Sequence, residues 1–101
     1  MSPEKIVVSI DKDLEELIPG FLNNRRKDVN LLNEALANNK LDTLKSIGHS
    51  LKGVGGGYGF HQLSAIGEAI EKKAKAGETD GIPELISGMA DYLDRVKVVF
   101  E

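Results

Sequence analysis

The chain has 101 residues, of which 41% are hydrophobic and 29% are charged, values typical of one ordinary globular domain with a modest core. It contains no cysteine, which excludes disulfides and thiolate metal sites, and its net charge of −3 argues against a nucleic-acid binder. Because no apolar run is long enough to cross a bilayer and the start lacks a hydrophobic signal region, we expect a cytoplasmic protein with no membrane partner.

The N-terminal region begins with a β-prone run at residues 6–10 that has no hairpin partner beside it. We expect residues 1–10 to form an extended arm that packs on the body of the protein. Asp11 or Asp13 is suited to cap a helix that follows, and Pro19-Gly20 is expected to break or kink that helix. Its apolar face is formed by Leu14, Leu17, Ile18, Phe21 and Leu22.

Helical spacing of apolar residues continues through the rest of the chain and leaves little room for strands. The expected helices cover about residues 21–38, 41–59, 60–75 and 81–99. Gly59 is suited to the left-handed end of the second of these helices, and Asp80 to the cap of the last. Long helices with short connections predict an all-α fold in a single domain of residues 1–101. This fold is an antiparallel four-helix bundle over about residues 11–100, with a short extra N-terminal segment or helix.

The segment 49–59, His-Ser-Leu-Lys-Gly-Val-Gly-Gly-Gly-Tyr-Gly, is unusually rich in glycine for a helix. Each glycine in a helix interior costs roughly 1 kcal/mol relative to alanine, so something must compensate. At about 100° per residue, the apolar positions lie opposite His49, while Lys52, Gly53 and Gly56 flank it. The pattern predicts an exposed imidazole with cleared space around it and an ammonium group nearby, as expected of a nucleophile that receives a bulky anionic group.

A turn near residues 57–60 makes the helices on either side of it a hairpin, in which His49 faces Ile70 or Glu71. Because Ile70 belongs to the apolar stripe, Glu71 is the neighbour that can reach the imidazole from the side. A carboxylate that accepts the Nδ1 proton would fix the tautomer and leave Nε2 as the free nucleophilic nitrogen. Gly67, one turn before Glu71, leaves further room.

These residues resemble the signature of the histidine-containing phosphotransfer (HPt) domains of bacterial two-component phosphorelays. That signature is a His-x-Leu-Lys-Gly run, a glycine six residues further on, a leucine four after that, and a hydrophobic residue followed by an acid or amide. The matching residues are His49, Leu51, Lys52, Gly53, Gly59, Leu63, Ile70 and Glu71.

The resemblance implies a helical bundle whose histidine accepts a phosphoryl group at Nε2 from a receiver-domain aspartate and passes it to another receiver. By position, His49 is then the phosphoacceptor, Lys52 accommodates the phosphoryl charge and Glu71 orients His49. The residues expected to contact the receiver are Lys45, Gly53, Gly56 and Glu68.

The expected partners are response-regulator receiver domains and a sensor or hybrid histidine kinase, and the protein itself is expected to be a monomer. Phosphoryl transfer usually needs Mg²⁺. No cluster of carboxylates is expected around His49 to hold that metal, so the receiver would supply it. The chain is therefore expected to be a phosphocarrier rather than an enzyme, with no cofactor and no metal site.

Other interpretations of the same residues are a nucleotide-binding loop and a metal site. The glycines do not form a nucleotide-binding loop, because Tyr58 stands where a third glycine is needed and no strand precedes them. A metal site made by His49, His61, Glu68 and Glu71 is conceivable, although a turn separates the two histidines. His61, at the start of its helix, is expected to be a solvent-exposed or capping residue.

Three further classes of protein compete with a phosphocarrier. A non-catalytic scaffold would make His49 replaceable. In the phosphoacceptor hairpin of a sensor kinase an acid normally follows the histidine, where this chain has Ser50, and the sequence shows no ATP-binding portion. The chain could also be the phosphoacceptor domain of a larger chemotaxis-type or hybrid kinase, although its Met start favours a free-standing protein.

Overall fold

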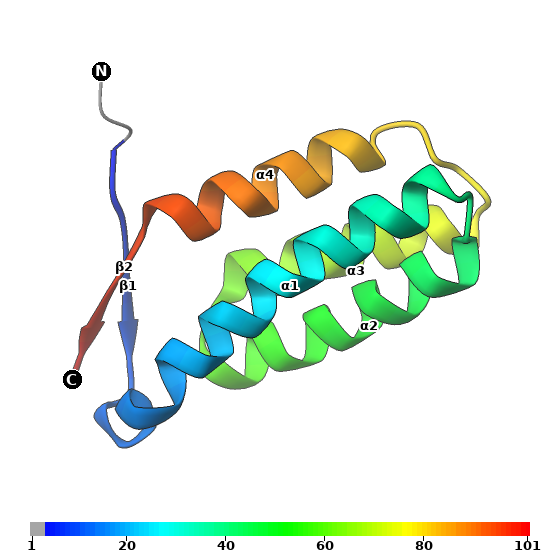
Figure 1. Ribbon diagram of the computed structural model, residues 1–101. Helices are drawn as coiled ribbons and strands as arrows, with labels where there is room; N and C mark the ends of the chain where they lie inside the picture. Colours follow the sequence, from blue (N-terminus) through cyan, green and yellow to red (C-terminus); the bar gives the residue numbers. More distant parts are fainter. Residues whose placement is uncertain (1–3) are drawn as a thin grey trace.

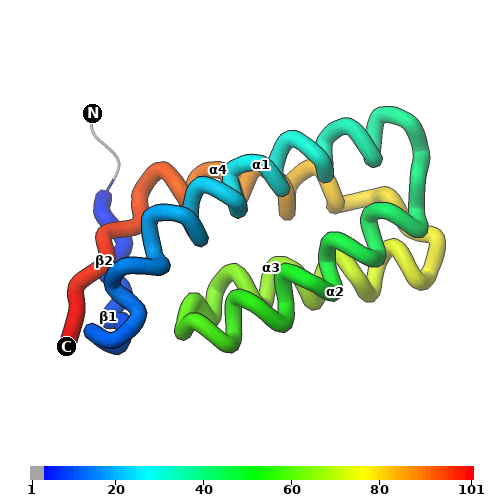
Figure 2. Tube along the Cα trace, turned by 60° about the horizontal axis from the view of Figure 1, so that its bottom comes forward, coloured from blue at the N-terminus to red at the C-terminus, as the bar shows by residue number. Residues whose placement is uncertain are grey.

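The computed structural model describes residues 4–101, which form four α-helices, a short 3-10 helix and two strands. In chain order these are β1 (Ile6–Ile10), η1 (Lys12–Leu17), α1 (Ile18–Ala37), α2 (Leu41–Tyr58), α3 (His61–Lys75), α4 (Ile82–Arg95) and β2 (Val96–Phe100). Helices α1 and α4 lie side by side in one layer, and α2 and α3 form the other (Figure 1, Figure 2). The expectation of a mostly helical chain with long helices in these positions is confirmed.

The two strands form a sheet that was not expected from the sequence. β1 pairs with β2 in parallel, in a register that places Ile6 beside Val96 and Ile10 beside Phe100. The extended arm is therefore one strand of a sheet whose other strand comes from the opposite end of the chain (Figure 1). Residues 1–3 of the expected arm lie outside the described residues.

The last helix is shorter than expected, because α4 ends at Arg95 rather than near Val99. The bundle therefore stops before residue 96 and does not extend to about residue 100. Residues 96–100 are Val-Lys-Val-Val-Phe, and β-branched and aromatic residues of this kind are favoured in strands. Half-buried and exposed side chains alternate along the segment. The expectation of little room for strands was wrong because β1 supplies backbone partners that local periodicity cannot reveal.

The start of α4 also differs from the expectation that Asp80 caps it. Gly81, with a φ of 86°, occupies the N-cap position, and no side chain caps the helix there. Pro83 lies in the first turn, where a residue without an N–H leaves one donor fewer to satisfy. Backbone conformation at Gly81 and the proline therefore replace the side-chain cap.

The N-terminal helical region is divided differently from the prediction. Asp11 caps η1, because its Oδ1 accepts a hydrogen bond of 2.9 Å from the N–H of Asp13. Pro19 lies in the first turn of α1 rather than inside a helix that it breaks. Proline suits this position because first-turn N–H groups have no partner within the helix. The expected break at Pro19-Gly20 is instead the beginning of a helix.

The hydrophobic core lies between the two layers of helices and is closed at one end by aromatic rings. Phe21 of α1 stacks on Tyr58 and Phe60, with ring centroids 4.5 Å and 5.0 Å apart respectively. Gly59, with a φ of 92°, ends α2 as predicted. These contacts fix the turn between α2 and α3 against α1. The largest fully buried side chains are Leu32, Leu44, Leu51, Phe60, Leu63, Ile70, Ile82, Ile86, Met89, Tyr92 and Leu93.

Tyr92 makes the stability of the fold sensitive to alkali. Burial raises the pKa of Tyr92 above its ordinary value of 10.0. Above pH 10 the unfolded chain releases the phenol proton before the folded chain does, so the free energy of unfolding should fall as the pH rises through this range. Urea unfolding at about pH 8 and about pH 11 should show a smaller fall for Tyr92→Phe than for the wild type, with Tyr58→Phe as the control. An equal fall in Tyr92→Phe and the wild type would contradict the assignment.

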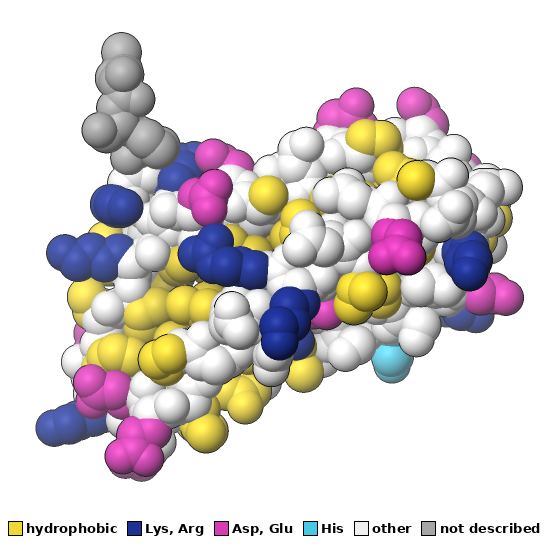
Figure 3. Space-filling model, viewed as in Figure 1, with side chains coloured by type: hydrophobic (Ala, Val, Ile, Leu, Met, Phe, Trp, Pro, Cys, Tyr) yellow, Lys and Arg dark blue, Asp and Glu magenta, His cyan; other side chains and the backbone are white. Residues whose placement is uncertain are grey.

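The surface carries apolar side chains mainly near the chain ends on the side drawn in Figure 3. There they gather between the strands and the beginning of α1, while charged side chains lie around this group and over the rest of that side. Val7 and Leu17 are large apolar residues with high exposure, 62% and 53% respectively.

Within residues 4–101, no helix combines the length and apolar character needed to cross a membrane.

Candidate functional site

His49 stands on the outer face of α2. Its side chain is 74% exposed, whereas Leu44 and Leu51 of the same helix are buried in the core. The helical periodicity of α2 accounts for this placement, since apolar side chains on one face oblige His49 to lie on the other. The imidazole is therefore open to solvent and to any protein that approaches α2 from outside.

Glu71 of α3 holds one nitrogen of this ring. Its Oε2 lies 2.7 Å from Nδ1 of His49, at the position expected from the hairpin. The carboxylate side chain is only 13% exposed, so the helices around it restrict its position. A carboxylate can only accept a hydrogen bond, so in the neutral ring Nδ1 donates the proton and Nε2 keeps its lone pair. The arrangement presents a nucleophilic nitrogen at the protein surface.

Three glycines bring the backbones of α2 and α3 into direct contact. A Cβ atom on Gly67 would lie 2.6 Å from the amide nitrogen of Lys52, and one on Gly48 would lie 2.8 Å from the carbonyl oxygen of Gly67. A Cβ atom on Gly55 would lie 2.7 Å from the amide nitrogen of Ser64. Gly67 was expected to leave room beside the histidine, but the backbone of α2 occupies the space beside it. Close helix packing explains these glycines.

Gly53 and Gly56 are of a different kind, because they face outward beside His49. A Cβ atom on Gly53 would meet no atom of the described residues within 4 Å. One on Gly56 would lie 3.6 Å from the hydroxyl oxygen of Ser64, an ordinary contact distance. Packing gives no reason for glycine at either position. The absence of side chains at these two positions agrees with the cleared space expected beside the imidazole from the sequence.

Of the charged residues expected around His49, Glu68 forms an ion pair and Lys52 forms none among the described residues. Lys45 and Lys52 are exposed on α2, and within the described part of the chain Lys52 has no ion pair. Glu68 lies 3.4 Å from the ammonium group of Lys72 on its own helix. Lys52 is thus the cation nearest in sequence to His49 that is free to meet an anion.

Of the four residues considered for a metal site, His49 and Glu71 lie in contact, but His61 lies apart from them. His61 lies at the beginning of α3 and lines a hollow with β1 residues such as Val8, not with His49. In residues 4–101, no three His, Cys, Asp or Glu side chains gather in a way that could hold a metal ion. Glu71 instead hydrogen bonds to the ring of His49.

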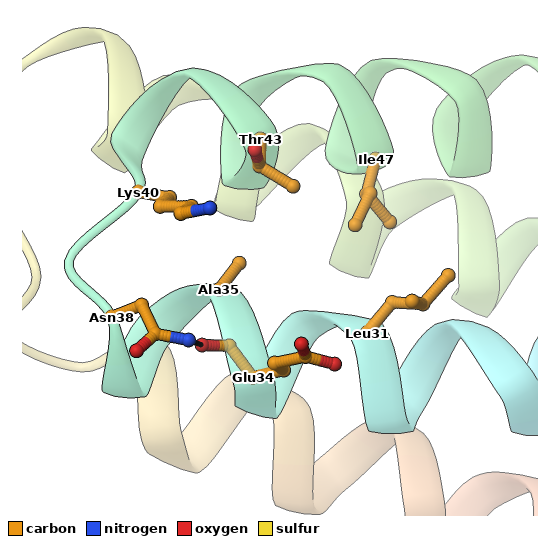
Figure 4. Close-up of a pocket in the computed structure, with 7 residues that line it drawn as sticks. All are labelled: Leu31, Glu34, Ala35, Asn38, Lys40, Thr43 and Ile47. Atoms are coloured by element: carbon orange, nitrogen blue, oxygen red, sulfur yellow. Dashed lines mark hydrogen bonds between the residues drawn. The ribbon is translucent and has the colours of Figure 1, made fainter.

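The hollow between α1 and α2 is separate from the histidine. The hollow in Figure 4, of about 330 Å³, lies between the second half of α1 and the first half of α2. Leu31 and Ile47 point toward each other across it, and Asn38 donates a hydrogen bond of 3.0 Å to the carbonyl oxygen of Glu34 at one end. Neither His49 nor Glu71 lines this hollow. A solvent-exposed imidazole of this kind suits a protein partner better than a small molecule, which normally binds in a concave pocket.

A hydrogen bond beside the site and two contacts of Arg25 on α1 were not predicted from the sequence. The hydroxyl of Ser64 donates a hydrogen bond of 2.8 Å to the carbonyl oxygen of Lys52 and so joins α3 to α2. On α1, Arg25 forms an ion pair of 2.9 Å with Asp28 and lies over the ring of Phe21. Burial raises the pKa of Asp28 above its ordinary value of 3.8, and Arg25 opposes that shift. The hairpin register was the signal that could have placed Ser64 beside α2.

Comparison with known protein families matches the chain to the Hpt domain over residues 16–98. The matched region contains α1 to α4 with His49, Lys52 and Glu71, and leaves out β1. The chain therefore belongs to the Hpt domain family. Members of this family are phosphocarriers that act in histidine phosphotransfer in two-component phosphorelays, with receiver domains and histidine kinases as partners. No curated protein and no solved structure matches the chain.

Proposed function

We propose that this protein accepts a phosphoryl group on Nε2 of His49 and exchanges it with aspartates of response-regulator receiver domains. The observation that carries the proposal is the 2.7 Å contact between Nδ1 and Glu71 on a ring that is 74% exposed. It favours the tautomer in which the outward-facing Nε2 is the nucleophile. The helices would then act as an antiparallel four-helix bundle that presents this one side chain.

In the proposed transfer, the lone pair of Nε2 forms a bond to phosphorus while the bond between phosphorus and the receiver's aspartate oxygen breaks. The aspartate leaves as a carboxylate, and the phosphorylated ring gains positive charge because Nδ1 keeps its proton. Glu71 stabilises that charge through the hydrogen bond that it already makes. The reverse reaction, toward another receiver, uses the same groups.

The receiver is proposed to bring the Mg²⁺ that phosphoryl transfer usually requires. On this chain, Glu71 is engaged with His49 and Glu68 with Lys72, which leaves neither as a ready ligand beside Nε2. The receiver would dock over the outward-facing glycines of α2, Gly53 and Gly56. Lys45 and Glu68 would contact it at the edges of the same surface, and a sensor or hybrid histidine kinase would supply the phosphoryl group to the relay.

Lys52 should accelerate the transfer because its ammonium group, one turn from His49 on α2, can approach the charge on the moving phosphoryl group. We expect Lys52→Ala to slow transfer about tenfold, which corresponds to about 1.4 kcal/mol of lost transition-state stabilisation. Stopped-flow measurement of transfer from a phosphorylated receiver checks this, with Lys75→Ala at the end of α3 as the control. Equal rates for Lys52→Ala and the wild type would remove Lys52 from the mechanism.

The proposed function is tested by incubating the protein with Mg²⁺ and a panel of phosphorylated receiver domains, then measuring its intact mass at alkaline pH. A phosphocarrier should gain one phosphoryl group, and acid should remove it, because a phosphorus–nitrogen bond to imidazole is acid-labile. Absence of any adduct across the panel would contradict the proposal and favour a non-catalytic scaffold. Such a scaffold would bind receivers without a change in its mass.

A further inference from the structure

We propose that Gly67 and Ser64 are positioning residues for the phosphoacceptor, because they set the separation and register of α2 and α3 at which Glu71 reaches Nδ1 of His49. This inference rests on the proposed function, since it concerns the orientation of the histidine that carries the phosphoryl group. The hydrogen-bond partner of the imidazole is Glu71, whereas the Ser64 hydroxyl bonds to the backbone of α2 and Gly67 packs against it. Both would act through the backbone of α2 and through Glu71.

The three residues of α3 that matter lie on one face of that helix. Ser64, Gly67 and Glu71 recur at steps of three and four residues, which places them in a row along the helix axis. They meet α2 in sequence: Ser64 and Gly67 contact the backbone around Lys52, and Glu71 meets His49. A change in how this row sits on α2 must therefore change the position of the Glu71 carboxylate.

Gly67 sets the separation of the two helices. A Cβ atom there would lie 2.6 Å from the amide nitrogen of Lys52 and 2.7 Å from the carbonyl oxygen of Gly48. Both atoms are backbone, so no flexible side chain could move aside, and any larger residue would push α3 away from α2. A hydrogen bond to an imidazole nitrogen is effective over only about 2.7–3.2 Å. A shift of a few tenths of an ångström or more would therefore weaken the contact between Glu71 and His49.

Ser64 sets the register. Packing at Gly67 limits how close the helices come, but it does not prevent α3 from sliding along α2 or turning about its own axis. The hydrogen bond from the Ser64 hydroxyl to the Lys52 carbonyl oxygen, 2.8 Å long, restricts both motions. Because Lys52 is one turn from His49, the same bond also fixes the part of α2 from which the proposed phosphoryl-binding ammonium group extends.

The inference is tested by nitrogen NMR of the unphosphorylated protein with ¹⁵N-labelled histidine. Ring shifts should show the proton of His49 mainly on Nδ1 in the wild type, and a substantial shift toward Nε2 in Gly67→Ala and Ser64→Ala. The ring shifts of His61 should stay constant in every sample. Transfer from a phosphorylated receiver should be slower in both variants by about tenfold or more, by analogy with the loss of a hydrogen-bond partner that orients a metal-binding histidine.

Two control variants make the same chemical changes elsewhere. Gly88→Ala on α4 adds a methyl group where a Cβ atom would meet no described atom within 4 Å, and Ser87→Ala removes an exposed hydroxyl from the same helix. Both should keep the wild-type tautomer and transfer rate. If Gly67→Ala fails to fold, Ser64→Ala still decides the matter, because it removes a hydroxyl and introduces no clash.

The outcomes separate this inference from the proposed function. Wild-type tautomer populations and rates in folded Ser64→Ala and Gly67→Ala would overturn the positioning role, even if the wild type accepts a phosphoryl group. A wild type that accepts no phosphoryl group would overturn the proposed function, while the tautomer shifts would still show whether these residues orient the ring.

Discussion

Replacing His49 with glutamine should abolish phosphoryl acceptance while leaving the helix content unchanged. The amide side chain of glutamine has no nucleophilic nitrogen, so the loss should reach the detection limit of intact-mass measurement rather than a fraction of the wild-type value. The imidazole is 74% exposed, so the substitution removes little packing. Surface changes of this kind usually alter the free energy of unfolding by no more than about 0.5 kcal/mol. Circular dichroism and urea unfolding check that the fold remains.

The second histidine provides the control for this experiment. His61 lies at the beginning of α3 and lines a hollow next to β1, where it has no carboxylate partner among the described residues. His61→Gln should therefore accept the phosphoryl group as the wild type does. Acceptance by His49→Gln would place the phosphoryl group elsewhere in the chain and contradict the assignment of His49.

Adding one methyl group to Gly55 should destabilise the protein, whereas the same addition to Gly53 should stabilise it. A Cβ atom on Gly55 would lie 2.7 Å from the amide nitrogen of Ser64 and 3.2 Å from the carbonyl oxygen of Phe60, so α2 and α3 would have to separate. Overpacking of this kind typically costs about 1–3 kcal/mol. At Gly53 the space is open, and replacing glycine by alanine inside a helix gains about 1 kcal/mol.

Urea unfolding of Gly55→Ala and Gly53→Ala measures this difference directly, because both substitutions lie on α2 and add the same atoms. The two midpoints should fall on opposite sides of that of the wild type. If Gly55→Ala unfolds at the same urea concentration as Gly53→Ala, the two helices do not meet at Gly55 as closely as the structure shows. The comparison therefore tests the close packing of α2 against α3, the helix that carries Glu71.

Much of the candidate site follows from local pattern. Helical periodicity places His49 opposite the apolar residues of its helix, because side chains about 100° apart around the axis sort into one buried and one exposed face. Gly59 ends that helix in a left-handed conformation, and the resulting short turn defines the register in which Glu71 lies beside His49. Periodicity and turn chemistry are properties of neighbouring residues, and they can be interpreted without knowing the rest of the fold.

The division of the glycines into two kinds required the tertiary structure. In the sequence, Gly53 and Gly55 are equivalent members of one cluster, but Gly55 contacts α3 through its backbone and Gly53 faces solvent. The distance between two helices depends on how their surfaces fit together, which the pattern of one helix does not contain. For the same reason the hydrogen bond from Ser64 to Lys52 was not foreseen.

The parallel sheet was likewise decided only by tertiary structure. By their apolar spacing, residues 96–100 fit the end of a helix and a strand equally well. They form a strand because β1, at the other end of the chain, pairs with them. By itself the sequence determined the helical class, the exposed histidine and its carboxylate neighbour, all through contacts between residues close in the chain or joined by a short turn. Tertiary structure decided strand pairing and helix separation, because both depend on backbone partners that only the assembled fold brings together.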